Sequence, residues 1–278
     1  MNFKPLGEAS RVSEIGMGTY YDPQWITTAK GFGWRRGASS KVAALKAGLD
    51  GGMNLIDTAE LYGSEPLVAE AIRGRKRDEV FIATKVWPSH LRRDALVRAL
   101  DKSLGRLETS YVDLYMAHFP NPRVPIGETM AAMEEMKDKG KILSIGVSNF
   151  SLQQVKEAIA ALKNSQLASN EVEYSLANRE IERDLLPYCE SNKISIISYY
   201  PLGHGRLTRG SWGEKAMKIC KAYGKTPAQV DLNWLVTGRN VFAIPRASRA
   251  EHVKENLGAS DWKLEPEDRA QLEAAFPV

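Results

Sequence analysis

The chain has 278 residues, of which 43% are hydrophobic and 26% are charged, as is typical of a globular protein with a sizeable core. Its formal net charge of +4 is too small to indicate a nucleic-acid-binding protein. No apolar run approaches the ~18 residues of a membrane span, and the N-terminus lacks the apolar segment of a signal peptide. We therefore expect a cytoplasmic protein with neither a nucleic-acid nor a membrane partner.

The chain has few residues that could form disulfides or bind a metal ion. Cys189 and Cys220 are the only cysteines, and two distant cysteines do not make a disulfide framework or a metal cluster. No His, Cys or Asp group has the spacing of metal ligands. We expect two reduced thiols and no metal site.

Apolar runs alternate with helix-like segments along the whole chain. The expected strands are 14–19, 53–57, 80–85, 112–118, 142–148, 167–174, 194–200 and 240–245. The expected helices are 40–52, 65–74, 92–107, 126–140, 151–162, 181–192, 213–224, 226–236, 249–258 and 265–276. Ser40 is the expected N-cap of the first, and the pairs Ser151–Gln154 and Thr226–Gln229 predict capping boxes. The stretch 20–39, with Trp25 and Trp34, is interpreted as an irregular loop, either a lid or a poorly ordered segment.

Eight strand–helix units in this length predict an α/β protein, a single-domain (β/α)8 TIM barrel over residues 1–278. The strands are apolar throughout rather than alternating, as expected when both faces of a sheet are buried. An open doubly wound sheet is the competing fold, but it usually has a G-x-G-x-x-G turn after its first strand. The segment "GMGTYY" at 16–21 does not fit that pattern.

Several expected strands end on a polar residue, and a barrel gathers these strand ends at one mouth. Strands two, three and four end on Asp57, Lys85 and His118, and Tyr62 follows Asp57 closely. Each residue alone has an ordinary structural interpretation, such as a capped turn or a satisfied core histidine. Because the three strands are neighbours in a barrel, we expect the four side chains to converge.

The chemistry of this group suits proton transfer to an oxygen. A free tyrosine titrates near ~10, and a neighbouring ammonium is expected to lower that value. Asp57 would keep Lys85 charged and oriented, and His118 would hydrogen-bond a carbonyl or alcohol oxygen. The group is suited to carbonyl reduction or alcohol oxidation, with Tyr62 as the general acid–base.

The motifs around these residues resemble those of the aldo-keto reductase family, and the resemblance covers nearly the whole chain in order. The matching segments are "GMNLIDTAELYG", "ATKVW", "DLYMAHFP", "IGVSNF", "SYYPLG" and "IPRASRAEHVKENLGA". The resemblance implies a (β/α)8 barrel that binds NAD(P)(H) and converts small aldehydes, ketones or sugars and the matching alcohols. It implies a catalytic tetrad of Asp57, Tyr62, Lys85 and His118.

The resemblance also implies binding residues. Ser148 and Asn149 would bind the nicotinamide carboxamide, Tyr199 would stack on the ring, and Arg246 would lie near the adenosine ribose. The implied cofactor-binding set is Gly18, Thr19, Ser148, Asn149, Glu171, Tyr199, Leu202, Gly203, Leu207, Ile244, Arg246, Ser248, Arg249, His252, Glu255 and Asn256. The implied substrate-binding residues are Tyr20, Trp87 and Phe119.

Some positions depart from the family pattern. Glu171 stands where the family commonly has glutamine; it can accept a hydrogen bond from the carboxamide but cannot donate one. Arg246 replaces a common lysine and keeps the charge, whereas His252 stands where many NADPH-specific members have arginine. We therefore expect NADP(H) to be preferred and NAD(H) to be usable. The loop "PNPRVP" is short, which suggests a prokaryotic or archaeal-type member with an open pocket. We also expect a monomer.

Two other functions are weighed against this one. The first is a Schiff-base lyase that uses Lys85, although an ammonium paired with Asp57 is a poor nucleophile because attack needs a neutral amine. The second is a non-catalytic nucleotide-sensing barrel, which would bind the cofactor without turnover. The physiological substrate and the reaction direction do not follow from the sequence.

Overall fold

The structure is a computed structural model that describes residues 1–31, 37–208 and 214–276. Eight parallel strands form one sheet in the order β10-β9-β8-β7-β6-β5-β4-β3. They are β3 (Met17–Gly18), β4 (Leu55–Asp57), β5 (Phe81–Val86), β6 (Val112–Ala117), β7 (Ile142–Ser148), β8 (Leu167–Glu173), β9 (Ser195–Tyr199) and β10 (Val241–Ala243). Each lies within or beside a strand that the sequence predicts, so the eight predicted strands are confirmed.

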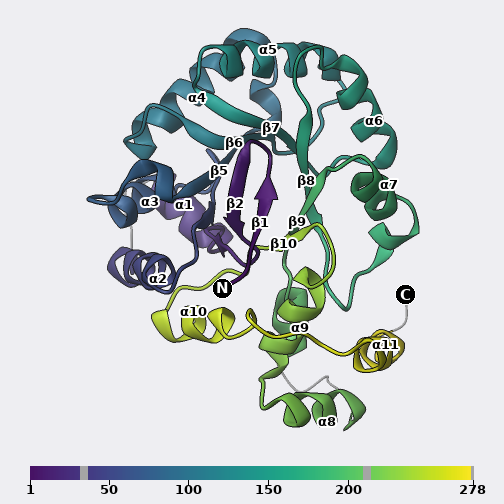
Figure 1. Ribbon diagram of the computed structural model, residues 1–278. Helices are drawn as coiled ribbons and strands as arrows, with labels where there is room; N and C mark the ends of the chain where they lie inside the picture. Colours follow the sequence, from purple (N-terminus) through teal and green to yellow (C-terminus); the bar gives the residue numbers. More distant parts are fainter. Residues whose placement is uncertain (32–36, 209–213, 277–278) are drawn as a thin grey trace.

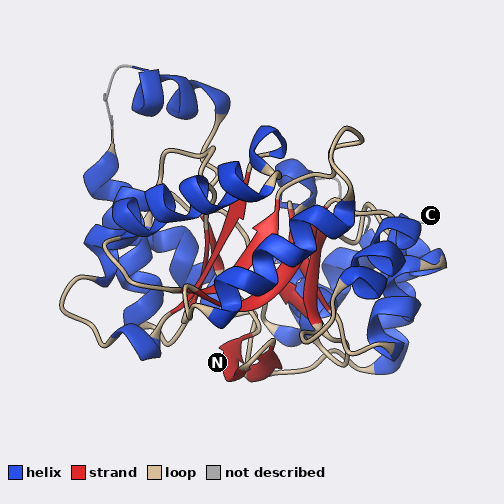
Figure 2. Cartoon of the chain, turned by 90° about the horizontal axis from the view of Figure 1, so that it is seen from above, coloured by secondary structure: helices blue, strands red, loops and turns tan. Residues whose placement is uncertain are grey.

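The two edges of this sheet meet and close the barrel. Isolated parallel bridges join Ile15 to Ala243 and Gly18 to Arg246. The N–H of Gly16 donates to the carbonyl oxygen of Ala243 at 2.8 Å, and the N–H of Ala243 donates to that of Glu14 at 2.9 Å. The helices lie around the outside of the strands in both views (Figures 1 and 2). This is the predicted (β/α)8 barrel.

An N-terminal hairpin precedes the barrel, and the sequence analysis missed it. Strands β1 (Phe3–Leu6) and β2 (Ala9–Ser13) pair antiparallel across a turn that contains Gly7 at φ 57°. The hairpin covers the centre of the barrel in Figure 1 and lies at one end of it in Figure 2. Its Leu6 and Val12 pack with the apolar side chains inside the barrel, so the hairpin closes the end opposite the strand termini that carry the polar residues.

The helices largely follow the predicted segments. They are α1 (Pro23–Gly31), α2 (Ala38–Asp50), α3 (Glu65–Ile72), α4 (Arg93–Leu107), α5 (Ile126–Asp138), α6 (Leu152–Ala161), α7 (Leu185–Ser191), α8 (Glu214–Tyr223), α9 (Pro227–Val236), α10 (Ala250–Leu257) and α11 (Pro266–Ala275). Short 3-10 helices span Arg77–Glu79, Pro88–His90, Glu180–Arg183 and Gly203–Thr208. Both predicted capping boxes are present, at Ser151–Gln154 and Thr226–Gln229. None of the helices within the described ranges is both long and apolar enough to cross a bilayer.

Two predictions near the first helix are wrong. The stretch 20–39 contains helix α1, which Asp22 caps by accepting a hydrogen bond from the N–H of Trp25 at 2.7 Å. Ser40 is not an N-cap, because α2 begins at Ala38 after Gly37, and the Ser40 hydroxyl donates to the carbonyl of Ser248 instead. Trp34, the other tryptophan of the proposed lid, lies outside the described residues.

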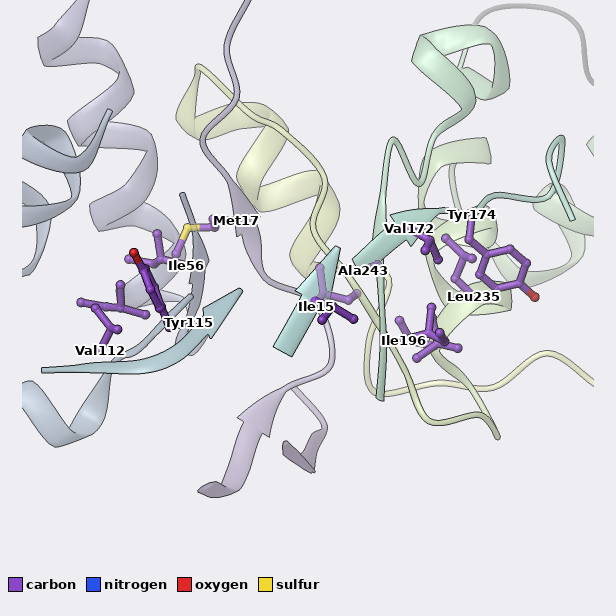
Figure 3. Packing of buried hydrophobic residues seen from close by; sticks show 14 of the residues in the cluster. Ile15, Met17, Ile56, Val112, Tyr115, Val172, Tyr174, Ile196, Leu235 and Ala243 are labelled. Atoms are coloured by element: carbon purple, nitrogen blue, oxygen red, sulfur yellow. The ribbon is translucent and has the colours of Figure 1, made fainter. Parts of the chain in front are cut away.

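Two layers of apolar side chains hold the barrel together. One fills the inside of the strands and includes Leu55, Leu114 and Phe242. The other lies between the strands and the surrounding helices, and Figure 3 shows members of it, including Ile56, Tyr115 and Ile196. Close packing on both faces of the short strands explains why they read as continuous apolar runs and keeps their polar ends in fixed positions.

Candidate active site

A cavity of about 780 Å³ opens where the barrel strands end. The residues that line it come from the ends of β3, β4, β7, β8 and β9 and from the loops that follow the barrel strands, including those after β5, β6 and β10. Among the predicted site residues, those that line it are Gly18, Tyr20, Asp57, Tyr62, Trp87, His118, Phe119, Ser148, Asn149, Glu171, Tyr199, Leu202, Ile244 and Arg246. The predicted convergence of strand ends is therefore present.

Lys85 lies beneath the cavity floor with no exposed side-chain surface. Its Nζ donates to Asp57 Oδ1 at 2.5 Å and to the carbonyl oxygen of Thr58 at 3.1 Å. Burial alone would lower the pKa of this ammonium, but the carboxyls of Asp57 and Glu171 outweigh burial and raise the pKa above its usual value. The site thus contains a permanent positive charge that is fixed in place.

Tyr62 lies above this ion pair. Its hydroxyl is 3.3 Å from Nε2 of His118, and the Lys85 Nζ is 5.2 Å from the centre of its ring. The register of β4, β5 and β6 accounts for this, because neighbouring parallel strands present their ends side by side. The four residues Asp57, Tyr62, Lys85 and His118 form one connected group.

The pKa of Tyr62 differs from the sequence expectation. We expected the neighbouring ammonium to lower it, but burial raises the pKa well above the usual value for tyrosine, and Lys85 opposes only part of that effect. The prediction of a lowered pKa is wrong for this state of the site because it left out desolvation. Tyr62 is held as a phenol, the form that can donate a proton.

His118 is held neutral. Burial, with a further contribution from the Lys85 charge, lowers the pKa of its imidazole to about 3. Its Nδ1 is buried and has no hydrogen-bond partner in the described structure. The Phe119 ring stacks on the imidazole, with centroids 5.1 Å apart. Nε2 therefore faces Tyr62 on a ring fixed by its neighbours.

A second carboxyl approaches the same ammonium. Oε1 of Glu171, on β8, lies 3.2 Å from Lys85 Nζ, and the side chain is almost fully buried. Its Oε2 is buried without a hydrogen-bond partner in the described structure. Burial first, and the nearby charge of Asp57 second, raise the pKa of the Glu171 carboxyl well above its usual value.

Three polar side chains form a connected row across the cavity wall. Tyr199 donates its hydroxyl to Asn149 Oδ1 at 2.8 Å, and Asn149 Nδ2 donates to Ser148 Oγ at 3.0 Å and to the carbonyl oxygen of His118 at 3.1 Å. Asn149 has φ 61°, a left-handed conformation that turns the chain directly after β7. These three side chains hold one another in place, and all three line the cavity.

Aromatic rings surround the cavity mouth. The rings of Tyr20 and Tyr62 meet edge to face with centroids 5.2 Å apart, and Trp87 contacts both His118 and Phe119 in the same way. The Phe119 side chain is 39% exposed. A planar or apolar organic molecule could therefore reach the Tyr62 hydroxyl between aromatic faces.

The far side of the cavity is shaped by a close backbone approach. A Cβ at Gly18 would lie 2.7 Å from the carbonyl oxygen of Ile244, so only glycine leaves the β3–β10 contact intact. Arg246 follows this contact and is exposed at the cavity edge. Its guanidinium is therefore free to reach an anionic group that extends from the cavity.

Not every predicted site residue lines this cavity. Thr19 is fully buried and donates its hydroxyl to the carbonyl oxygen of Asp57 at 2.8 Å, so it holds β3 against β4. The predicted residues outside the lining are Thr19, Lys85, Gly203, Leu207, Ser248, Arg249, His252, Glu255 and Asn256. Arg249 is the N-cap of helix α10 and His252 is exposed on it, so both residues lie on the surface outside the cavity lining. Their binding roles stay predictions.

The sequence analysis missed part of the lining. The missed residues are Tyr21, Asp22, Pro23, Leu61, Tyr200, Pro201 and Pro245. The ring of Tyr200 lies on that of His204, with centroids 3.8 Å apart, and both residues have positive φ. The dipeptide "YY" before "PLG" was the available signal, since Tyr200 directly follows a residue that was predicted to belong to the site.

An eight-stranded barrel with a buried lysine–aspartate pair beneath a tyrosine and a histidine is the arrangement that the sequence motifs predicted for an aldo-keto reductase. The Aldo/keto reductase family model matches residues 14–276. The chain belongs to this enzyme family.

Individual relatives agree with this assignment. The chain is 36% identical over 269 residues to the methylglyoxal reductase YeaE of Escherichia coli K12, covering 95% of this chain and 91% of the relative. Among solved structures, the thermostable aldo-keto reductase Tm1743, crystallised with the inhibitor epalrestat, is 39% identical with a TM-score of 0.90, over 99% of this chain and 100% of that one. An aldo/keto reductase from Klebsiella pneumoniae, in complex with NADP and acetate, is 38% identical with a TM-score of 0.88, over 98% and 94% of the two chains.

Proposed function

We propose that the protein is an NADP(H)-dependent reductase of small aldehydes and ketones, with Tyr62 as the proton donor. The observation that carries the proposal is the position of the Tyr62 hydroxyl, 3.3 Å from His118 Nε2 at the floor of the cavity and above the charged Lys85. A carbonyl oxygen beside this hydroxyl and Nε2 could receive a proton from Tyr62 and a hydrogen bond from a neutral His118.

The described residues fit a nicotinamide cofactor. Ser148, Asn149 and Glu171 present oxygen and amide groups on one wall, and the unpartnered Oε2 of Glu171 can accept from a carboxamide N–H. Tyr199 offers a ring next to them, and Arg246 offers a positive charge at the cavity edge. When bound, the reduced cofactor supplies the hydride that the carbonyl carbon receives.

The protein groups then have distinct parts in the reduction. Tyr62 gives its proton to the carbonyl oxygen, which becomes the alcohol hydroxyl, and Lys85 stabilises the phenolate that remains. Asp57 keeps the ammonium in place, and the phenolate regains a proton from bulk water. In the reverse direction the same phenolate would accept the alcohol proton.

The Schiff-base alternative has less support. Lys85 is buried below the floor and bonded to Asp57 and Thr58, and its raised pKa keeps it charged, whereas a Schiff base needs a neutral, accessible amine. The nucleotide-sensing alternative differs from the reductase only in turnover. Monomeric state, single-domain organisation and cytoplasmic location stay predictions.

The substrate class can be narrowed by experiment. Initial rates would be measured with NADPH and with NADH against methylglyoxal, an aromatic aldehyde, an aldose and a simple ketone. Methylglyoxal is included because the relative YeaE is a methylglyoxal reductase. We expect turnover with NADPH on at least one aldehyde and slower turnover with NADH. Cofactor binding without turnover on any carbonyl or alcohol would support the sensor, and borohydride trapping of a substrate on Lys85 would support the lyase.

A further inference from the structure

Glu171 is an ionisable residue of the site to which the proposed reduction gives no proton-transfer role. Two carboxyls, on Asp57 of β4 and Glu171 of β8, flank the single ammonium of Lys85, at 2.5 Å and 3.2 Å. All three side chains are almost fully buried. One positive charge neutralises only one carboxylate, and a second unbalanced carboxylate in a buried site would be costly.

The contacts indicate which carboxyl retains a proton. Asp57 receives the short hydrogen bond from Lys85, whereas the nearer Glu171 oxygen lies 3.2 Å from the same ammonium, and this closer contact favours ionised Asp57 and protonated Glu171. Desolvation raises the pKa of both groups, and only for Glu171 does the other carboxyl raise it further. The balanced arrangement is therefore Lys85 charged, Asp57 ionised and Glu171 neutral.

A neutral carboxyl at this position resembles a carboxamide in its hydrogen bonding. It has one donor, which Asp57 can accept, and acceptor oxygens, of which Oε2 is unpartnered and belongs to a residue that lines the cavity. Glu171 can thus act as a glutamine would toward an uncharged ligand. Unlike glutamine, it can also become negative when a positive charge enters the cavity.

We infer that Glu171 is a proton-carrying residue that responds to the redox state of the cofactor, being protonated beside the neutral reduced nicotinamide ring and ionised beside the positively charged oxidised ring. The inference rests on the proposed function, because it needs the nicotinamide to bind near Ser148, Asn149 and Glu171. When oxidised cofactor binds, the O–H bond of Glu171 breaks, the electron pair stays on the carboxylate, and the proton passes to bulk water.

The groups that face Glu171 determine how readily it releases its proton when the oxidised cofactor binds. They are Asp57 from β4, Lys85 from β5, Tyr62 from the loop after β4 and Tyr199 from β9. Asp57 is already ionised and Lys85 is held charged, so the phenols of Tyr62 and Tyr199 are the other groups that could release a proton when the ring is positive. The experiment must therefore distinguish the Glu171 carboxyl from these phenols, and loss of the release in Glu171→Gln is the result that assigns the proton to Glu171.

The test is the proton balance of cofactor binding. Binding of NADP+ and of NADPH would be followed by calorimetry at pH 7 in two buffers of different ionisation enthalpy. Wild type, Glu171→Gln, Tyr62→Phe and the matched control Glu173→Gln, also on β8 but outside the cavity lining, would be compared. We expect wild type, Tyr62→Phe and Glu173→Gln to release a proton on binding NADP+ but not on binding NADPH.

Glu171→Gln should bind NADPH about as wild type does, which also shows that it is folded. It should release no proton with NADP+, and its affinity for NADP+ should fall by about tenfold, as expected for loss of one charge-assisted contact. The affinity of wild type for NADP+ should rise between pH 6 and pH 8, whereas that of Glu171→Gln should stay flat.

The outcomes separate the inference from the function. If both nucleotides bind and Glu171→Gln still releases the proton, or Tyr62→Phe abolishes the release, the inference is wrong and the proposed function stands. Equal proton balance for NADP+ and NADPH in wild type would likewise overturn the inference alone. If neither nucleotide binds wild type, both fail.

Discussion

The hydroxyl of Tyr62 and Nε2 of His118 lie 3.3 Å apart, and they belong to segments separated by 56 positions in the chain. The contact exists because β4 and β6 flank β5 in the barrel, which brings the loop after β4 over the end of β6. Both groups are neutral in this geometry, since burial raises the pKa of Tyr62 and lowers that of His118 to about 3. A neutral pair can offer a carbonyl oxygen a proton and a hydrogen bond together.

The lowered pKa of His118 predicts a stability effect with a definite sign. Its folded pKa of about 3 lies below the usual value of 6.5. The stabilisation that neutral His118 gives the folded state is therefore complete above pH 6.5 and is lost as the pH falls toward 3. Between pH 7 and pH 5, wild type should lose about 2 kcal/mol more unfolding free energy than His118→Gln.

Urea unfolding at the two pH values measures this difference. His90→Gln is the matched control, because His90 is nearly half exposed and contacts Glu60 at the surface. We expect the control to lose stability as wild type does. Equal losses for wild type and His118→Gln would mean that His118 is not held neutral by the fold.

Asp57 and Glu171 should support Lys85 as partial substitutes for each other. In Asp57→Asn, Glu171 can lose its proton and remain 3.2 Å from the ammonium, so the loss of unfolding free energy should be moderate. In Asp57→Asn/Glu171→Gln the buried ammonium has no carboxylate partner, and a loss of about 3–5 kcal/mol is expected.

A double-mutant cycle in denaturant measures the coupling between the two carboxyls. The double variant should lose at least about 1 kcal/mol more than the sum of the single variants. Additive losses would show that the two carboxyls support Lys85 independently, against the account of a shared proton.

Arg246 is the residue we expect to favour a phosphorylated cofactor. Its exposed guanidinium at the cavity edge can form charge-assisted hydrogen bonds with a 2′-phosphate, worth about 1.5–3 kcal/mol. Arg246→Ala should weaken NADPH binding by about tenfold or more and leave NADH binding nearly unchanged. The dissociation constants of both nucleotides check this. Arg239→Ala would not serve as the control, because the Arg239 side chain is part of a buried network with Glu182. Arg11→Ala, far from the cavity lining, is the better one.

If Arg246→Ala weakened NADPH and NADH equally, Arg246 would contribute to binding without distinguishing the phosphate. Arg249 and His252, on the exposed part of α10, would then be the remaining candidates for that role.

Much of the barrel was predictable because its strands can be recognised from short stretches of sequence. Runs such as 142–148 are buried on both faces except at Leu143, and capping boxes such as Thr226–Gln229 mark helix starts within a few residues. The grouping of Asp57, Lys85 and His118 followed from strand order alone, because neighbouring strands of a barrel share one mouth.

Other features were missed for identifiable physical reasons. The N-terminal hairpin was missed because its strands around Gly7 are short, although the glycine turn between them was a sequence signal for a hairpin. Asp22 before Pro23 was a helix-start signal inside the supposed loop. The approach of Glu171 to Lys85 was not readable, because it joins β8 to β5 across the barrel and depends on closure and on the reach of a long side chain.

The central claim is that Tyr62 donates the proton, and the most direct measurement is the kcat of Tyr62→Phe with NADPH and a reducible aldehyde. The substitution removes only the hydroxyl, so the variant should fold and bind NADPH as wild type does, and nucleotide binding serves as the control. General acid catalysis typically contributes about 10²-fold or more, so we expect kcat below about one hundredth of the wild-type value. A Tyr62→Phe enzyme that bound NADPH normally and kept more than about a tenth of the wild-type kcat would contradict the account.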